Sequence, residues 1–385
     1  MTETRRIAVI GAGFSGTILT AHLLRLSRSG LHVYLINKSG RLARGVAYGT
    51  RSSRHVLNVP AGRMSAFASD ENDFLRFAQR RDAGVTGGTF VPRQLYGEYL
   101  EHILLSAQAQ GVRGSVLSHV ADEALSVEES ADGNSALVRL AHSAPLTVDR
   151  VVIAAGNYTP TPPHLPDARF LDDPRFVTDP WKPLALDGVA GDRPVAIIGT
   201  GLTMVDVALD LAARGHKGGL IAISRRGLLP QPHRHGTSPP SYGHLPPDLI
   251  ATAPTAANYL RAVRRHVRRL EREGIDWREV IASLRPVTPR LWKALPDAEK
   301  ARFLRHLRPY WEAHRHRLAP ELWSALQELM ATGGLRAMPA RLTNIEPADH
   351  ALRVSLRRRD SARVETLEVS AVVNCTGPEG DVRRL

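Results

Sequence analysis

The feature that most constrains the fold of this chain is a glycine turn that occurs twice, each time between an apolar run and a stretch with helical periodicity. The first turn spans residues 11–16 and the second begins at residue 199. A further apolar run follows each helical stretch, at 31–36 and at 220–224. Strand, glycine turn, helix and parallel strand in this order form the βαβ unit of a mononucleotide-binding fold. The sequence therefore predicts two such units.

The two halves of the chain also end alike. Residues 151–156 read Val-Val-Ile-Ala-Ala-Gly and residues 371–377 read Ala-Val-Val-Asn-Cys-Thr-Gly, and in both an apolar run closes on glycine after alternating short runs. This pattern is typical of meander strands, and its recurrence indicates a divergent internal duplication. We therefore predict an α/β fold with two Rossmann-like dinucleotide-binding domains, each with a β-meander.

A chain of 385 residues exceeds the size at which one hydrophobic core usually stops growing. Between residues 254 and 330 the pattern is almost wholly helical, and this stretch holds four of the five tryptophans. We interpret it as a helical insertion in the second domain. The predicted boundaries are 1–165 for the first domain, 190–335 for the second with its insertion at about 251–332, and 336–385 for a segment that returns toward the first domain.

The formal net charge of +13 raises the question of a polyanionic partner. Many arginines lie within residues 261–272, where Leu260, Val263, Val267 and Leu270 recur at spacings of three and four and leave the arginines outside. A solvated helix face explains these arginines better than nucleic-acid binding does. The single cysteine, Cys375, follows an apolar run and is predicted to be a buried packing residue.

The sequence gives no indication of a signal peptide or of a membrane span. The apolar stretch near the N-terminus is broken by three glycines, unlike the core of a signal peptide. No run approaches the roughly 20 apolar residues of a membrane span. We therefore expect a cytoplasmic protein without a membrane partner.

The three glycines of the first turn have separate predicted tasks. Gly11 turns the chain, Gly13 lets the backbone approach a pyrophosphate, and Gly16 lets the helix pack against the strand. The N-terminus of the helix then faces the phosphates with unpaired N–H groups. A carboxylate that binds ribose is expected about 20 residues further on, but Asn37 stands there, so we expect a weaker contact with the ribose.

The second turn has Gly199 and Gly201, but Met204 stands at the third position, so helix and strand should lie slightly further apart. The strand after it ends at Arg225 and Arg226 without an acidic residue. Arginine at this place suits the 2′-phosphate of NADP. The sequence favours NADPH, with NADH as the alternative and surface charge as the non-functional explanation of the two arginines.

A set of motifs spread over nearly the whole chain adds a resemblance. The motifs are Gly-Ala-Gly-Phe-Ser-Gly at 11–16, Arg-Gly-Val-Ala-Tyr-Gly at 44–49, Leu-Asn-Val-Pro-Ala-Gly-Arg-Met at 57–64, Phe-Val-Pro-Arg at 90–93 with Tyr96-Gly97, and His-Arg-His-Arg-Leu-Ala-Pro at 314–320. Together they resemble the bacterial FAD/NAD(P)-binding protein family, which is similar to flavin-containing monooxygenases and amino-acid N-hydroxylases. The resemblance implies FAD in the first domain and NAD(P)H in the second.

The resemblance also implies roles for individual residues. The residues expected near the FAD pyrophosphate are Gly11, Gly13, Ser15 and Gly16, with Asn37 at the ribose position, Asn58, Val59, Pro60 and Met64 near the flavin, and Gly156 at the closing strand. The residues expected to meet NADP are Gly199, Gly201, Thr203, Arg225 and Arg226. Arg93 is expected to contact a phosphate or a substrate acid.

One departure from the family concerns the C-terminus. Flavoproteins of this kind return to the FAD domain after the second closing glycine with a strand and a helix that cover the flavin. This chain ends at Leu385, eight residues past Gly377. Either the capping elements are missing, or the chain is a shortened form of a longer protein.

Two other chemistries are not indicated. The histidine pairs His233/His235 and His314/His316 lack accompanying cysteines or a convincing set of carboxylates, so no metal site is predicted. Ser15 does not stand in the G-x-S-x-G context of a nucleophilic serine.

The preferred function is an FAD-dependent, NAD(P)H-using oxidoreductase in which hydride passes from NADPH to flavin N5. Because the cofactors perform the chemistry, no acid/base pair need appear, and no catalytic side chain is predicted. The favoured subclass is a monooxygenase, such as an N-hydroxylase, whose small-molecule substrate is an amine or amino acid. The alternatives are a simple NAD(P)H:flavin reductase and a flavin-binding module without catalysis.

Overall fold

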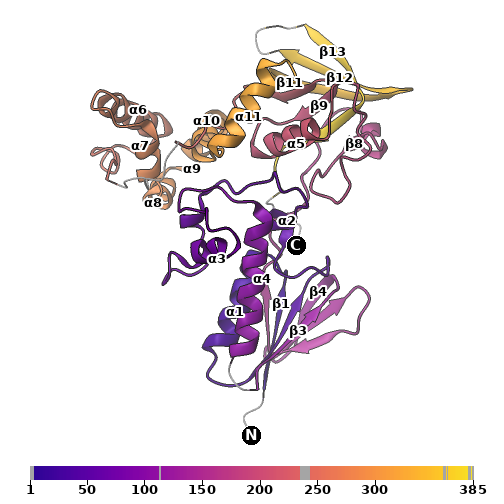
Figure 1. Cartoon of the computed structure of the whole chain (residues 1–385), viewed down its shortest axis with the longest axis vertical. Coiled ribbons are helices and arrows are strands. Elements are labelled where there is room, and N and C mark those ends of the chain that lie inside the picture. The colour runs from indigo at the N-terminus through magenta and orange to yellow at the C-terminus, as the bar shows by residue number, and fades with distance from the viewer. Residues whose placement is uncertain are drawn as a thin grey trace. The chain divides into compact units, whose positions relative to one another are not determined.

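The computed structural model describes residues 4–111, 114–234, 243–358, 361, 363–379 and 383. Its internal contacts divide the chain into two units (Figure 1). Unit 1 comprises Met1–Thr159 and Pro378–Leu385, and unit 2 comprises Pro160–Gly377. Each unit has its own sheet and its own hydrophobic core.

Unit 1 contains a four-stranded parallel sheet in the order β3-β2-β1-β7. The strands are β1 (Arg5–Ile10), β2 (Leu31–Ile36), β3 (Val116–Val120) and β7 (Arg150–Ile153). Ala8 and Val9 of β1 are fully buried, and so are Val33 and Leu35 of β2. Strands buried on both faces read as continuous apolar runs, which explains the pattern seen in the sequence.

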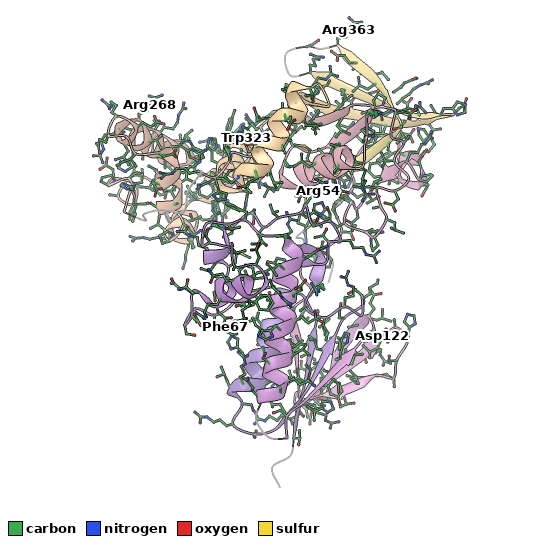
Figure 2. The ribbon with its side chains drawn as sticks, in the orientation of Figure 1. Arg54, Phe67, Asp122, Arg268, Trp323 and Arg363 are labelled. Carbon is green, nitrogen blue, oxygen red and sulfur yellow. The ribbon has the colours of Figure 1, made fainter. Side chains whose placement is uncertain are left out.

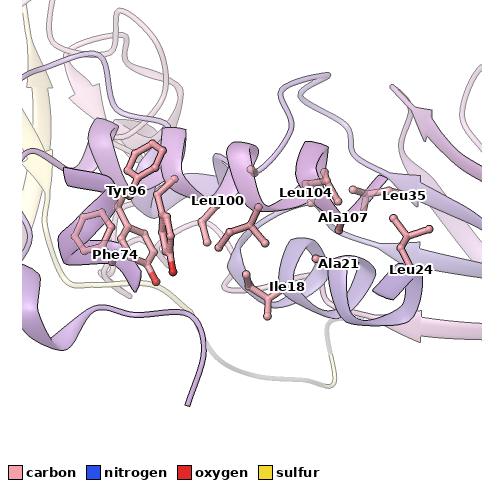
Figure 3. Packing of buried hydrophobic residues seen from close by; sticks show 14 of the residues in the cluster. Ile18, Ala21, Leu24, Leu35, Phe74, Tyr96, Leu100, Leu104 and Ala107 are labelled. Carbon is pink, nitrogen blue, oxygen red and sulfur yellow. The ribbon is translucent and has the colours of Figure 1, made fainter. Parts of the chain in front are cut away.

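The helices of unit 1 cover one face of this sheet. They are α1 (Phe14–Leu26), α2 (Gly45–Tyr48), α3 (Asp73–Arg81) and α4 (Arg93–Gln110), with the 3₁₀ turn η1 (Ala61–Arg63). Helices α1 and α4 pack side by side (Figure 3). Their contact is built from buried aliphatic side chains, namely Ile18, Ala21 and Leu24 with Leu100, Leu104 and Ala107.

An antiparallel three-stranded sheet completes unit 1. Its strands are β4 (Ala124–Glu129), β5 (Ala136–Leu140) and β6 (Leu146–Val148), connected in sequence as a meander. Val138 and Val148 are buried in one cluster with Ala8 and Ile36 of the parallel sheet. The meander therefore covers the face of the sheet opposite to helix α1.

Unit 2 contains a seven-stranded sheet in the order β13-β12-β11-β10-β9-β14-β8. The strands are β8 (Phe176–Val177), β9 (Val195–Ile198), β10 (Leu220–Ser224), β11 (Leu335–Ala348), β12 (Ala351–Arg358), β13 (Val364–Val369) and β14 (Ala371–Asn374). The strands from β8 to the start of β11 are parallel, and the second half of β11 forms an antiparallel meander with β12 and β13.

Helices α5 (Leu202–Ala213) and α11 (Pro320–Ala331) pack together in unit 2, and the turn η2 (Arg169–Asp172) lies near its strand β8. Val205 and Leu211 of α5 share a buried cluster with Leu326 of α11. Cys375 lies in the same cluster and is buried, and burial raises the pKa of its thiol. The cysteine is a packing residue, as the apolar run before it indicates.

A helical insertion separates β10 from α11. Its helices are α6 (Ala256–Glu271), α7 (Trp277–Ser283), α8 (Thr288–Ala294), α9 (Asp297–His306) and α10 (Arg308–Arg315). The buried line on α6 is Ala262, His266 and Leu270, with Val263 partly buried. The expectation that Leu260 belongs to this line is wrong, because Leu260 is exposed. The buried line is therefore shifted from the predicted one, with Ala262 and His266 in buried positions.

The predicted fold class is confirmed: two Rossmann-like halves, each with a meander, and a helical insertion in the second. The structure differs in detail from the predicted boundaries. Strands β11 to β14 pair within the sheet of unit 2, and α11 packs on α5 in the core of that unit. Near the C-terminus, the N–H of Tyr158 donates to the carbonyl of Glu379 over 3.1 Å within unit 1.

Candidate dinucleotide-binding sites

Gly11 is the point at which three strands of unit 1 converge. It adopts a φ of +106°, and its N–H donates to the carbonyl of Ile36 over 2.8 Å. A Cβ at this position would lie 2.3 Å from the carbonyl oxygen of Ala154, which follows β7. Only glycine satisfies both the backbone angle and this close approach.

Gly16 brings helix α1 against the same turn. A Cβ here would lie 1.8 Å from the carbonyl oxygen of Gly11 and 3.3 Å from a methyl carbon of Val9. The N–H of Thr17 closes the first helical hydrogen bond to the carbonyl of Gly13 over 3.0 Å. The first turn of α1 is thus fixed directly against the end of β1.

Gly13 leaves the N-terminus of α1 bare. It is the N-cap residue, in an extended conformation, and no side chain accepts from the N–H groups of the first turn. A Cβ on Gly13 would meet nothing nearer than the Cα of Gly45, at 3.8 Å. Ser15 is exposed in the same turn. Free N–H groups and the positive end of the helix dipole make this place suitable for a phosphate.

Arg44 fixes the segment that faces Gly13. Its Nη2 lies 2.8 Å from a carboxylate oxygen of Glu101, and its Nη1 donates to the carbonyl of Gln94 over 3.1 Å. Gly97 in helix α4 makes room, because a Cβ there would lie 2.7 Å from the Arg44 guanidinium. Sequence reasoning assigned no role to Arg44. The available signal was a glycine inside a helix, which costs stability and therefore needs a packing reason.

Asn37 follows β2 at the predicted ribose position, but its side chain already forms contacts within its own turn. Its amide nitrogen donates to the carbonyl of Arg41 over 2.7 Å, and its amide oxygen accepts from Ser39. Lys38 forms an ion pair with Glu123 at 2.6 Å. One amide N–H of Asn37 is left for a further acceptor.

The segment from 55 to 64 runs beside residues 87–93. Leu57 donates its N–H to the carbonyl of Val91 over 2.9 Å, and Gly62 donates to Gly87 over 3.0 Å. Among the residues expected near the flavin, Asn58 is exposed, Val59 and Pro60 are half-buried, and Met64 packs against the core. The guanidinium of Arg93 donates to the carbonyl of Val56 over 3.0 Å, so it also secures this segment.

Gly156 lies just beyond β7 with a φ of +73° and is exposed. A Cβ at this position would meet nothing within 4 Å. The glycine is therefore required by its backbone angle and not by crowding from the protein.

The turn after β9 repeats the geometry of the first turn. Gly199 has a φ of +113°, its N–H donates to the carbonyl of Ile223 over 2.8 Å, and a Cβ would lie 2.4 Å from the carbonyl oxygen of Cys375. Gly201 caps α5 without a side-chain acceptor, and a Cβ there would meet nothing within 4 Å. Met204, at the third position, is fully buried. Since Met204 carries a Cβ, α5 cannot approach its turn as closely as α1 does.

The two arginines after β10 have different surroundings. Arg225 is exposed and makes no ion pair within the described part of the chain. Arg226 donates to the hydroxyl of Tyr310 over 3.1 Å and to the carbonyl of His306 over 3.2 Å, and its guanidinium lies 5.0 Å from the ring centroid of Tyr310. Thr203 is half-buried in the first turn of α5. Arg226 is therefore held by the helical insertion, which sequence spacing did not indicate.

The histidines do not assemble a metal site among the described residues, where no group of three or more metal-ligating side chains occurs. His314 contacts the carbonyl of Tyr310 at 2.8 Å and the ring of Trp277 with centroids 5.0 Å apart. His233 donates its backbone N–H to the carbonyl of Leu318 over 2.8 Å. His235 lies outside the described residues.

Comparison with known proteins agrees with this geometry. Residues 8–158 match a family model described as FAD-NAD(P)-binding. The predicted resemblance is thereby confirmed for this part of the chain, and the family description names both predicted cofactor classes, FAD and NAD(P). A flavin-containing monooxygenase of Aspergillus flavus is 27% identical over 228 residues, which are 55% of this chain and 51% of the relative. The chain thus spans about half the length of that curated relative.

Solved structures match over almost the whole chain. Ornithine hydroxylase from Pseudomonas aeruginosa has a TM-score of 0.64 at 18% identity and covers 100% of this chain and 85% of its own. The chain has the two-dinucleotide-binding flavoprotein fold. Ornithine N-hydroxylase from Kutzneria sp. 744, in a complex with reduced FAD, NADP⁺ and L-ornithine, also matches this flavoprotein fold, with a TM-score of 0.61 at 15% identity over 98% of this chain and 81% of its own.

Among the described residues, no helix combines the length and the apolar character needed to cross a bilayer.

Proposed function

We propose that this chain is an FAD-dependent, NADPH-using oxidoreductase of the monooxygenase type that acts on an amine or amino acid. One observation carries the proposal: two glycine turns of the same geometry occur in one chain, each at the N-terminus of a helix without a side-chain cap. Two sites for dinucleotide phosphates in one chain are what a protein needs to bring a nicotinamide and a flavin together.

The first turn fits FAD. The open space at Gly13 and the free N–H groups of α1 would receive the pyrophosphate, with Ser15 beside them. Gly11 and Gly16 shape this place and are not available to a ligand, because both are in close contact with backbone. Asn37 would meet the ribose through its remaining amide N–H. A single neutral hydrogen bond is weaker than the usual carboxylate contact.

The second turn fits NADPH. The open space at Gly201 and the first turn of α5 with Thr203 would receive the pyrophosphate. Arg225, exposed and without a charged partner among the described residues, is suited to the 2′-phosphate that distinguishes NADPH from NADH. Arg226 would add charge from a fixed position, because Tyr310 holds its guanidinium.

When both groups are bound, the nicotinamide supplies a hydride and the flavin carries the electrons to oxygen or another acceptor. The side chains of this protein bind and orient these groups. Arg44 holds the start of α2 opposite Gly13 and so keeps the first phosphate site in shape. No side chain is assigned a role in proton transfer.

The monooxygenase subclass is supported by the proteins that share the fold. The Aspergillus flavus relative is a flavin-containing monooxygenase, and the two solved structures are those of ornithine hydroxylases. We therefore propose that the hydroxylation takes place at the amine of the substrate. A flavin-binding module without catalysis is the second candidate, and it is favoured by one observation: the side chain of Asn37 is largely committed to its own turn.

The test begins with the absorbance spectrum of the purified chain, incubated with FAD and then with NADPH under anaerobic conditions. We expect a bound flavin that bleaches on addition of NADPH and reoxidises with air. Formation of a hydroxylated amine would identify a monooxygenase, and stoichiometric hydrogen peroxide without that product would identify a reductase. Bound flavin that NADPH does not bleach would overturn the proposal in favour of the non-catalytic module.

A further inference from the structure

A buried hydroxyl connects the second glycine turn to the loop that carries the two arginines after β10. Thr200 is the middle residue of that turn, and only 7% of its surface is exposed. Its hydroxyl donates toward two acceptors, the hydroxyl oxygen of Ser224 over 2.9 Å and the carbonyl of Leu228 over 2.7 Å, which share its one proton. Both ends of the loop 224–228 therefore meet at one side chain of the turn.

The loop 224–228 is also ordered from within. Ser224 is the last residue of β10, and its hydroxyl oxygen accepts the backbone N–H of Gly227 over 3.0 Å. Gly227 has a φ of +63°, so the chain turns back directly after the two arginines. Arg225 and Arg226 thus lie between fixed points of the backbone, and the fixed points are joined to the glycine turn through the hydroxyl of Thr200.

The first glycine turn shows that such a turn does not need this hydroxyl. Its middle residue is Ala12, which is buried and apolar. Gly11 nevertheless has nearly the same backbone angle as Gly199, with φ values of +106° and +113°. The loop after β2 is instead held by the side chain of Asn37, which bonds within its own turn. The hydroxyl of Thr200 therefore serves the loop after β10, and the shape of the glycine turn does not depend on it.

The two arginines of this loop differ in how much they depend on its backbone. The guanidinium of Arg226 has an anchor of its own, because it donates to the hydroxyl of Tyr310 over 3.1 Å. Arg225 is exposed and has no ion pair within the described part of unit 2. The position of Arg225 is therefore set by the loop backbone alone. A cation that is held in place before binding loses less conformational entropy when it meets a phosphate.

We propose that Thr200 is a positioning residue for the selection of NADPH over NADH, and that it acts through Arg225. Its hydroxyl fixes the loop that carries Arg225 relative to the turn at which the pyrophosphate would bind. The 2′-phosphate is the group that distinguishes the two dinucleotides, and an arginine at this place suits it. The proposal rests on the proposed function and adds a specificity determinant whose own side chain is buried.

The test measures the dissociation constants of NADP⁺ and NAD⁺ by isothermal titration calorimetry on the full chain loaded with FAD. The natural chain should bind NADP⁺ more tightly than NAD⁺. Thr200→Val keeps the shape of the side chain but removes its hydroxyl. It should weaken NADP⁺ binding about threefold to thirtyfold and change NAD⁺ binding less than about twofold, because only the 2′-phosphate uses Arg225. Thr200→Ser keeps the hydroxyl and should restore most of the selectivity.

Ser370→Ala is the matched control for the loss of a buried hydroxyl. Ser370 is buried, and its hydroxyl donates to the carbonyl of Pro194 over 3.1 Å, directly before β9 begins. Thr200 follows the other end of β9, so the control removes a hydrogen bond from the same sheet without altering the loop 224–228. It should leave the ratio of the two dissociation constants unchanged. Circular dichroism verifies that each variant is folded.

A double-mutant cycle tests whether Thr200 acts through Arg225. If it does, Thr200→Val should change NADP⁺ binding less than about twofold in a chain that already carries Arg225→Met. Arg268→Met is the control for the lost charge, because Arg268 is exposed on α6 of the same unit (Figure 2). In a chain that carries Arg268→Met, Thr200→Val should keep its full effect on NADP⁺ binding.

The outcomes separate this inference from the proposed function. Equal weakening of NADP⁺ and NAD⁺ by Thr200→Val would show a general effect on the glycine turn and would overturn the positioning role. A full effect of Thr200→Val in the absence of Arg225 would overturn it as well, and so would a natural chain that binds both dinucleotides equally. A natural chain that binds neither dinucleotide would instead refute the proposed function.

Discussion

Replacement of Gly16 by alanine tests the close contact on which the proposed phosphate site of unit 1 depends. The new Cβ would lie 1.8 Å from the carbonyl oxygen of Gly11, whereas ordinary carbon–oxygen contacts are about 3.3 Å or longer. Gly11 cannot retreat, because its N–H is bonded to Ile36 and its Cα faces the carbonyl of Ala154. Helix α1 would therefore have to move away from β1 by roughly 1.5 Å.

The expected cost follows from two opposing terms. Overpacking against a rigid neighbour destabilises a protein by about 1–3 kcal/mol, and contact with backbone places Gly16→Ala at the upper end. Alanine within a helix recovers about 1 kcal/mol relative to glycine. The net loss is about 2 kcal/mol, which lowers the midpoint of thermal unfolding by roughly 4–8 °C in a domain of this size.

The assay follows the release of FAD by its fluorescence during heating, because this signal reports on unit 1. Gly87→Ala serves as the control, since a Cβ there makes only ordinary contacts at 3.9 Å and the change should be within about 0.5 kcal/mol. We expect Gly16→Ala to lose flavin several degrees below Gly87→Ala. Equal release temperatures for the two variants would refute the packing role of Gly16.

Three further predictions concern other parts of the molecule. Gly13→Ala should leave the unfolding of the FAD-free chain unchanged but weaken FAD binding at least about tenfold, measured by equilibrium dialysis, because its Cβ lies in open space that a pyrophosphate would fill; full FAD content would contradict this. Tyr310→Phe removes the hydroxyl that holds Arg226. It should raise the KM for NADPH about threefold to tenfold and leave the KM for NADH unchanged. Equal changes in both KM values would show that Arg226 does not select the 2′-phosphate of NADPH. Hydrogen bonds from Ser143 and neighbouring backbone groups lower the pKa of Asp122 from 3.8 to about 2. The contribution of Asp122 to stability is therefore present above about pH 4 and is lost as the pH falls toward 2. Asp122→Asn should remove this part of the pH dependence of thermal unfolding, and an unchanged profile would disprove the assignment.

The glycine turns could be predicted because their requirements are local. A chain that reverses at Gly11 and starts a helix within five residues needs glycine at fixed spacings, whatever the rest of the protein does. The same spacing located Gly199 and Gly201. The wider spacing between helix and strand at Met204 could also be predicted, since a side chain at that position excludes the close approach seen at Gly16.

The boundaries and helix faces were less predictable, because they depend on which elements pack together. The helical pattern continues from the insertion into α11, but α11 packs on α5. Strands β11 to β14 continue the sheet of unit 2, as the meander pattern predicted, whereas the predicted boundary at residue 336 assigned them to a segment returning toward the first domain. On α6 the buried positions include Ala262 and His266, residues that carry little hydrophobic signal.

The sequence by itself determined the two glycine turns and the fold class, because both follow from spacings within a few residues and from the order of apolar runs. Only the tertiary structure decided which distant groups the arginines near the two turns contact. Arg44 contacts Glu101 across 57 residues, and Arg226 contacts Tyr310 across 84. The physical reason is that a guanidinium finds its partner by packing, and no spacing along the chain records which distant side chain the fold brings within reach.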